Sequence, residues 1–313
     1  MLKRIALAIS SALIVITAGC ASVEINDTIF PNGACLTKVR YELPKMTPNT
    51  TISNATPFIL PSGNGWKIEK YVKDNQETTT ATRMIQPGET LENDIHLQNT
   101  DPKTGKTTPY LANTVKIERL SGNRLKYIET LHWVGPKDTH FMDMDQKSVK
   151  ELKALLPSNL ATDDNVRKLT HNTVKLIWKA IFGPGEPLLP VLIMQPQLAE
   201  HRLNQRIGKS MLLSLKETFG DKLNANQRIQ LVRSIFKVAK ETGDANANQI
   251  QSPQSDNSSG NMCALYYTIK MPGKVLETNG EIDNVTGEVF WGVYDAAAMP
   301  GDVTLYAICQ VAK

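Results

Sequence analysis

Histidine and carboxylate side chains gather in one short stretch, which holds His140, Asp143 and Asp145. One imidazole and two carboxylates are groups that a metal ion or a hydrolytic site can use. The rest of a ligand set does not occur at a diagnostic spacing, so we expect no metal here. We interpret the stretch as a solvated loop in which Asp143 or Asp145 caps the next helix.

The other histidines, His96, His132, His171 and His201, are dispersed along the chain. His132 and Trp133 come at the end of a strand pattern and could line a groove. The sequence has no Gly-x-Ser-x-Gly, His-Glu-x-x-His or phosphate-binding glycine loop. We therefore expect a non-catalytic protein without a cofactor. The alternative is a hydrolase with a dispersed site, which requires His132, His140, Asp143 or Asp145 to meet another acid in one cleft.

The first nineteen residues have the pattern of an export signal. Lys3 and Arg4 precede an apolar core from Ile5 to Ile16, which is too short to span a bilayer. The following Thr17-Ala18-Gly19-Cys20 resembles the lipobox of bacterial lipoproteins, in which small residues precede a cysteine that is acylated. Thr17 departs from the usual aliphatic residue, which leaves cleavage near Ala21 and free secretion as the alternative.

The lipobox resemblance implies a location and a partner. Two or more acyl chains on Cys20 would hold the protein on a membrane of the cell envelope, whereas a single chain anchors marginally. Residue 21 is Ala and not Asp, which resembles an outer-membrane address. We expect a lipid-anchored protein on the periplasmic face of the outer membrane rather than on the inner membrane.

Composition excludes several classes of protein. The remaining chain of about 294 residues is long enough for one large domain or two modest ones, and 41% of the sequence is hydrophobic. The formal charge of +4 falls by two without Lys3 and Arg4, and no run of five like charges occurs. We therefore expect no nucleic-acid partner and no strong charge attraction to a membrane.

Cys35, Cys263 and Cys309 remain after Cys20 is set aside, in a compartment that permits disulfides. Each cysteine sits in a strand-like run with apolar residues at alternate positions, so all three are expected to face a core. A bridge from Cys263 or Cys35 to Cys309 is one interpretation, and buried free thiols are the other.

The remaining patterns predict an α+β fold. Strand signals at 34–43, 66–72, 78–85, 114–120 and 124–133 indicate an antiparallel sheet. Helical spacing at 146–156, 163–183, 196–220 and 226–239 predicts four helices, with Thr162 or Asp163 and Asn224 or Asn226 as caps. Strands return at 263–271, 274–282, 288–293 and 302–311.

Because strands lie on both sides of the helices, we expect one β domain interrupted by a four-helix insertion. The boundaries that follow are a signal peptide (1–19), an N-terminal β part (20–145), a helical insertion (146–242), a flexible linker (243–261) and a C-terminal β part (262–313).

The C-terminal strands carry a second resemblance. Met271-Pro272-Gly273 and Thr278-Asn279-Gly280, followed by Val289-Phe290-Trp291, resemble the β segment of LppM-like lipoprotein domains. The resemblance implies a membrane-tethered sheet packed with helices, and it brings no catalytic residues. Tight turns at positive φ and a core tryptophan explain the motif without a site.

An apolar segment from Leu176 to Met194 is broken by Pro184-Gly185-Glu186-Pro187, so it cannot span a membrane. We interpret it as a helix end and loop buried against the sheet. The sharper hypothesis is an exposed lobe that contacts a partner or the membrane. Its residues are Trp178, Phe182, Leu188, Leu189 and Ile193.

Together these features predict a membrane-anchored envelope lipoprotein with a non-catalytic binding or scaffolding role. Its ligand is an envelope protein or a lipid, and the sequence does not identify it.

Overall fold

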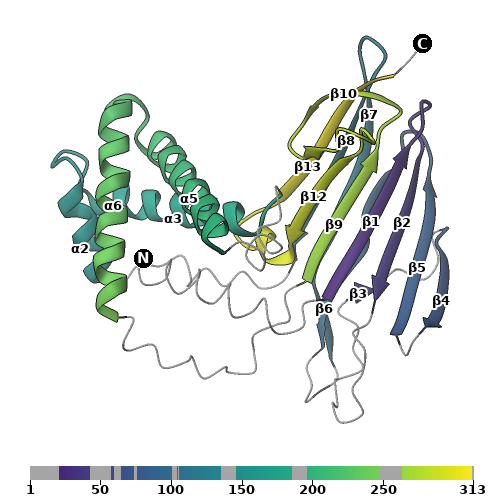
Figure 1. Ribbon diagram of the computed structural model, residues 1–313, viewed down its shortest axis with the longest axis horizontal. Helices are drawn as coiled ribbons and strands as arrows, with labels where there is room; N and C mark the ends of the chain where they lie inside the picture. Colours follow the sequence, from purple (N-terminus) through teal and green to yellow (C-terminus); the bar gives the residue numbers. More distant parts are fainter. Residues whose placement is uncertain are drawn as a thin grey trace. The chain divides into compact units, whose positions relative to one another are not determined.

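Figure 1 presents the computed structural model of the chain, which describes residues 21–42, 58–59, 65–73, 76–100, 104, 106–134, 146–184, 196–246 and 263–311. These residues form two compact units, a β unit and a helical unit. The helices are inserted between strands that belong to the same unit, so the expected α+β fold with a helical insertion is confirmed.

The described part of the β unit has thirteen strands. They are β1 (Ala21–Ile29), β2 (Cys35–Glu42), β3 (Phe58–Ile59), β4 (Lys67–Lys73), β5 (Gln76–Ile85), β6 (Thr90–Thr100), β7 (Thr107–Leu120), β8 (Arg124–Trp133), β9 (Cys263–Lys270), β10 (Gly273–Thr278), β11 (Glu281–Ile282), β12 (Val289–Tyr294) and β13 (Val303–Val311).

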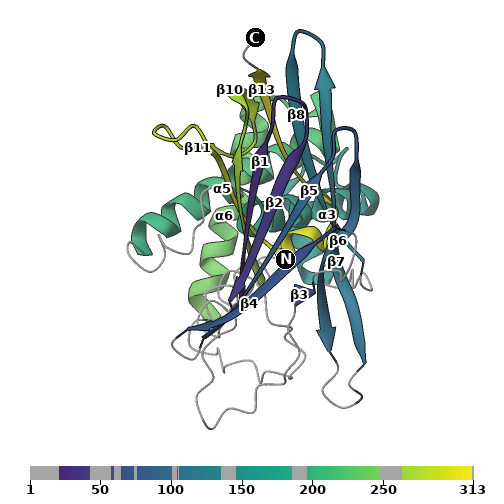
Figure 2. The same cartoon turned by 90° about the vertical axis from the view of Figure 1, so that its right-hand side faces the viewer.

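Two sheets pack face to face to make a β sandwich, which Figure 2 shows as two layers. The seven-stranded sheet has the order β11-β12-β9-β1-β2-β5-β4, and the six-stranded sheet has the order β10-β13-β8-β7-β6-β3. β1 and β9 run parallel, and the other paired strands are antiparallel. Each sheet therefore joins a block of strands from before the helical insertion to a block from after it, at the β1–β9 pair in one sheet and the β8–β13 pair in the other.

The central strand β1 is absent from the strands that the sequence predicted. Its inward positions are Val23, Ile25, Asp27 and Ile29, all of which are buried. Asp27 interrupts an otherwise regular apolar alternation, and a carboxylate is rarely fully buried unless it is paired. Because Asp27 breaks the apolar alternation, the sequence pattern did not predict β1.

The sandwich has two distinct ends. At the first, β1 begins at Ala21, which pairs with Cys263 of β9; we call this the Ala21 end. At the second, the turn of the β7–β8 hairpin contains Gly122 and Asn123, both with positive φ; we call this the Gly122 end. The Val311 amide donates to the Asn123 carbonyl (3.0 Å), so β13 ends there.

The chain crosses from one sheet to the other at Asn279-Gly280. β10 pairs with β13 in the six-stranded sheet, whereas β11 pairs with β12 in the seven-stranded sheet. The single strand predicted over 274–282 is therefore wrong. A short crossover closes this side of the sandwich.

The helical unit contains α2 (Gln146–Leu155), α5 (Pro196–Phe219) with the 3-10 helix η2 (Gly220–Lys222), α6 (Ala225–Asn246) and all but the last residue of α3 (Asp163–Phe182). α6 continues to Asn246, four residues into the segment that the sequence analysis assigned to a linker.

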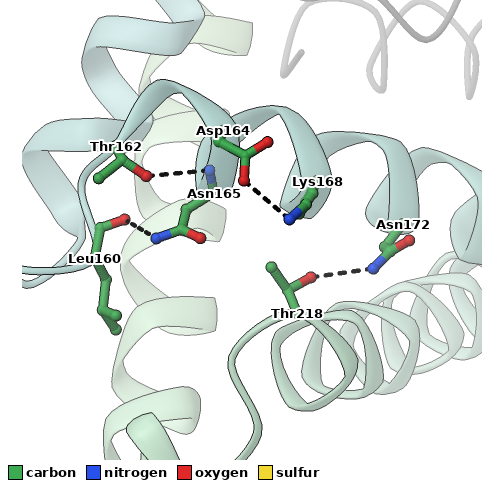
Figure 3. Close-up of polar contacts among 7 residues, drawn as sticks. All are labelled: Leu160, Thr162, Asp164, Asn165, Lys168, Asn172 and Thr218. Atoms are coloured by element: carbon green, nitrogen blue, oxygen red, sulfur yellow. Dashed lines mark hydrogen bonds and ion pairs between the residues drawn. The ribbon is translucent and has the colours of Figure 1, made fainter.

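Side chains cap two helices as the sequence suggested. Thr162 Oγ1 accepts from the Asn165 amide (3.3 Å), which selects Thr162 over Asp163 as the cap of α3 (Figure 3). Asn224 Oδ1 accepts from the Gln227 amide and Gln227 Oε1 accepts from the Asn224 amide, both at 2.9 Å. This reciprocal pair is a capping box and selects Asn224 over Asn226.

The helical unit has its own apolar core, made of residues from all four helices and their connections. Buried polar groups in it are paired: the hydroxyls of Thr173 and Ser214 lie 2.8 Å apart. Asn172 Nδ2 donates to Thr218 Oγ1 (3.1 Å), joining α3 to α5 (Figure 3). These bonds fix the register of the two helices at a low desolvation cost.

Candidate functional site

A hydroxyl, an imidazole and a carboxylate meet on the outer face of the six-stranded sheet. His132 Nδ1 lies 3.2 Å from Asp302 Oδ2, and its Nε2 lies 3.0 Å from Thr114 Oγ1. The register explains the meeting: Val303 pairs with Leu131 and faces the core with it, so their neighbours Asp302 and His132 adjoin on the outer face.

The two contacts define how a neutral His132 is hydrogen-bonded. Nδ1–H donates to the Asp302 carboxylate, which leaves Nε2 unprotonated to accept from the Thr114 hydroxyl. The order hydroxyl, imidazole, carboxylate is that of a nucleophile, a general base and an orienting acid. The His132 and Asp302 side chains are 35% and 57% exposed, so the site is open to solvent.

An acyl-transfer site also needs an oxyanion hole, and β7, the strand that carries Thr114, does not supply one. Such chemistry needs N–H donors aimed at the developing oxyanion. Thr114 lies in β7 with paired strands on both sides, opposite Glu92 of β6 and Thr130 of β8. Because Thr114 is paired on both sides, its own backbone belongs to the sheet and is not available to an oxyanion.

The hydrolase alternative predicted from the sequence required one of four residues to meet another acid. His132 does meet another acid, Asp302, while His140, Asp143 and Asp145 lie outside the described residues. The 121–123 turn already implies that Thr114 lies diagonally across from His132. Asp302 comes from a strand about 170 residues later, and only the tertiary structure brings it there.

A second polar cluster lies inside the sandwich. The Tyr127 hydroxyl is 2.8 Å from Asp27 Oδ2 and 2.6 Å from Glu129 Oε2, and Asn113 Nδ2 donates to Glu129 Oε1 (3.0 Å). A phenol has one proton to donate, so it can serve only one of the two carboxyl groups. The other carboxyl must be protonated and donate to the phenol oxygen.

Burial supports that reading. It raises the pKa of Asp27 from 3.8 to about 6, against the opposing effect of the Tyr127 and Thr37 hydroxyls. Burial first and the charge of Asp27 second raise the pKa of Glu129 from 4.5 to about 7, against the opposing effect of its hydrogen bonds. This pair joins the seven-stranded sheet to the six-stranded sheet through a shared proton.

A third buried carboxyl lies at the Ala21 end. Asp295, in the 3-10 helix η4 (Asp295–Ala298), accepts from the Tyr110 hydroxyl (2.8 Å) and from the Ala296 amide (2.7 Å). Burial raises its pKa to about 6, while these bonds and one from the Cys263 amide oppose the rise. Tyr110 is the extra residue of a bulge in β7, which turns its ring toward η4.

The C-terminal motif is structural. Asn279 Oδ1 accepts from Trp291 Nε1 (2.9 Å) and from the Tyr306 amide (3.0 Å), and its Nδ2 donates to the Thr304 carbonyl (2.8 Å). Trp291 is fully buried, as predicted. A Cβ on Gly280 would lie 2.5 Å from the indole, so this glycine serves close packing and not the positive φ that we expected.

The three cysteines are free and buried, as one of the two interpretations held, and the predicted bridge to Cys309 is not formed. Cys35 pairs with Ile29 and Cys263 pairs with Ala21, so these two thiols lie about 27 Å apart at opposite ends of β1. Cys309 is in the other sheet, opposite Leu125. Burial raises the pKa of the Cys35 thiol above its usual range.

The other predicted contact residues are only partly described. Trp178 is half-buried in α3, and Phe182 is buried with its ring edge-on to Tyr294 at 5.9 Å. Phe182 therefore packs inside the β unit and presents little surface. Cys20, Leu188, Leu189 and Ile193 lie outside the described residues.

Searches for other sites and for relatives complete the picture. Within the described ranges, no three His, Cys, Asp or Glu side chains are grouped to hold a metal ion, and no helix is long and apolar enough to cross a membrane. No protein-family model, curated protein or solved structure matches this chain.

Proposed function

We propose that this chain is a lipoprotein of the bacterial cell envelope, anchored through acylated Cys20, whose β sandwich has a non-catalytic binding or scaffolding role. The observation that carries the proposal is the junction Thr17-Ala18-Gly19-Cys20 after a basic and then apolar segment. The described fold begins directly after this junction, at Ala21. Cleavage before Cys20 would therefore leave every described strand and helix in the mature protein.

The outer membrane is the proposed location, because Ala and not Asp follows Cys20. The proposed partners are the bilayer, through the lipid, and an envelope protein or lipid as ligand. The resemblance of the Pro272-Gly273 and Asn279-Gly280 segments to LppM-like domains supports a tethered β domain. In the sandwich that motif links strands through the hydrogen bonds of Asn279.

Membrane fractionation with mass spectrometry of the mature N-terminus tests the anchor. We expect the wild type in the membrane fraction with its N-terminus at an acylated Cys20, and Cys20→Ser in the soluble fraction. A soluble, unmodified wild-type protein would overturn the proposal. The apolar lobe is tested alongside: if Leu189→Asp and Ile193→Asp change neither partner capture nor membrane contact while the protein stays folded, it has no docking role.

A hydrolase is the second candidate, and the contacts of His132 with Thr114 and Asp302 are what favour it. Purified protein would be assayed with p-nitrophenyl acyl esters. If His132 is a general base, His132→Gln lowers the rate by about 100-fold or more. Thr114→Val removes the hydroxyl with little change in volume, and Thr304→Val is the control because Thr304 lies on the same face, whereas the hydrogen bonds of His132 go to Thr114 and Asp302. Equal rates for all four proteins would exclude the hydrolase.

A further inference from the structure

We infer that the Ala21 end of the β sandwich faces the lipid bilayer, with β1 running away from the membrane. The inference rests on the proposed acylation of Cys20 and specifies which surface of the protein meets the headgroups.

A chain of hydrogen bonds defines this end across both sheets. Ala21 pairs with Cys263, whose amide bonds to the Asp295 carboxylate. Asp295 accepts from the Tyr110 hydroxyl, and the Tyr110 carbonyl accepts from the Val134 amide (2.9 Å). The start of β1, the helix η4 and the end of β8 therefore share one level of the sandwich.

The tether to this level is very short. Cys20 directly precedes Ala21, and consecutive Cα atoms are about 3.8 Å apart. β1 lies in the middle of its sheet with β2 and β9 bonded on either side, so it has no slack to lengthen the tether. The headgroup layer of one leaflet is about 5–7 Å thick. Acyl chains on Cys20 therefore hold the Ala21 end at the headgroup layer, and the ends of β6 and β7, which continue past Tyr110 to the Thr100–Thr107 pair, project toward the bilayer with it.

The opposite end must then project into the aqueous space. β1 has nine residues and spans about 27 Å. Val285 lies near the far end of this span, in the loop between β11 and β12: Val289 of β12 pairs with Ile269, which pairs with Asp27 near the end of β1. His132, near the end of β8, and Asp302, directly before β13, lie at the membrane side of the sandwich.

Two exposed valines allow a direct test. Val134 at the Ala21 end is 49% exposed, and Val285 at the Gly122 end is 94% exposed. Val134→Cys and Val285→Cys would be labelled with an environment-sensitive fluorophore in the full, acylated chain. The parent protein is the labelling control, since its described cysteines are buried free thiols and should not react. Each labelled protein would be reconstituted in phosphatidylethanolamine and phosphatidylglycerol vesicles that contain a headgroup nitroxide quencher.

We expect a loss of fluorescence at position 134 and none above background at 285. Equal quenching at both positions, or quenching at 285 alone, with Cys20 acylated would overturn the orientation while leaving the anchor intact. Unmodified Cys20 would overturn both proposals. Hydrogen exchange needs no fluorophore at the interface: vesicles should slow exchange at 295–302 relative to soluble Cys20→Ser and leave 283–287 unchanged. Unchanged exchange at 295–302 would also overturn the orientation.

Discussion

Replacing Glu129 by Gln should make this protein more stable at alkaline pH. The variant keeps the side chain's shape, and its Oε1 can still accept from Asn113. Its amide can donate to the Tyr127 oxygen, which frees the phenol proton for Asp27. The substitution therefore resolves the conflict between two carboxyl groups that share one hydroxyl.

The magnitude follows from the raised pKa values. In the folded protein the pKa of Asp27 is about 6 and that of Glu129 about 7, against ordinary values of 3.8 and 4.5. Each pKa unit corresponds to about 1.4 kcal/mol, so each carboxyl contributes a change of about 3 kcal/mol. Both residues are buried, and the full effect is expected.

The sign is set by which state holds the protons. The folded state retains protons that the unfolded chain has released, so the stability that this pair contributes is greatest below about pH 4. It falls as the pH rises through about 6 and 7, by about 6 kcal/mol for the pair. Cys35 and Tyr267 are near the pair, and burial raises the pKa of each, so they stay neutral through this range.

Urea unfolding of the soluble Cys20→Ser chain between about pH 4 and pH 8 measures this fall together with that of Asp295, whose pKa is also raised to about 6. Glu129→Gln should remove about 3 kcal/mol of it. Glu118→Gln is the matched control, because the bond from Lys116 lowers the pKa of that exposed-face carboxyl. If wild type and Glu129→Gln lose stability in parallel from about pH 5 to pH 8, the shared-proton reasoning is refuted.

Three further predictions follow from local geometry. Gly280→Ala should lower the free energy of unfolding by about 1–3 kcal/mol because the added methyl would overlap with Trp291. Gly208→Ala in α5 should instead raise it by up to about 1 kcal/mol, because its methyl only reaches ordinary contact with Phe236, at 3.8 Å, and Ala favours the helix. Asn224→Ala should cost about 1 kcal/mol through the lost cap of α6 and Asn226→Ala much less; equal losses in urea titrations would contradict the capping box. Ala21→Asp should move the protein from the outer to the inner membrane in density-gradient fractions, and an unchanged distribution would remove the sorting argument.

Much of the fold could be predicted from the sequence because its signals are local. The spacing of apolar residues and the capping residues Thr162 and Asn224 indicated the helices, since a helix is specified by residues three and four apart. The Gly122-Asn123 turn fixed the β7–β8 register and with it the proximity of Thr114 to His132. The Cys20 junction is likewise a linear pattern read by a protease and needs no fold.

The tertiary structure alone decided where distant residues meet. Asp302 reaches His132 because β13 pairs with β8 across the helical insertion, and no local pattern encodes that pairing. β1 was hidden by Asp27, whose burial is tolerated only because Tyr127 from the other sheet bonds to it. Packing between the sheets also divides the predicted strand 274–282 at Asn279-Gly280. Asn279 bonds to Trp291 and to β13, which lie on either side of the crossover. Sequence specifies short-range geometry, and packing between sheets decides which polar groups become partners.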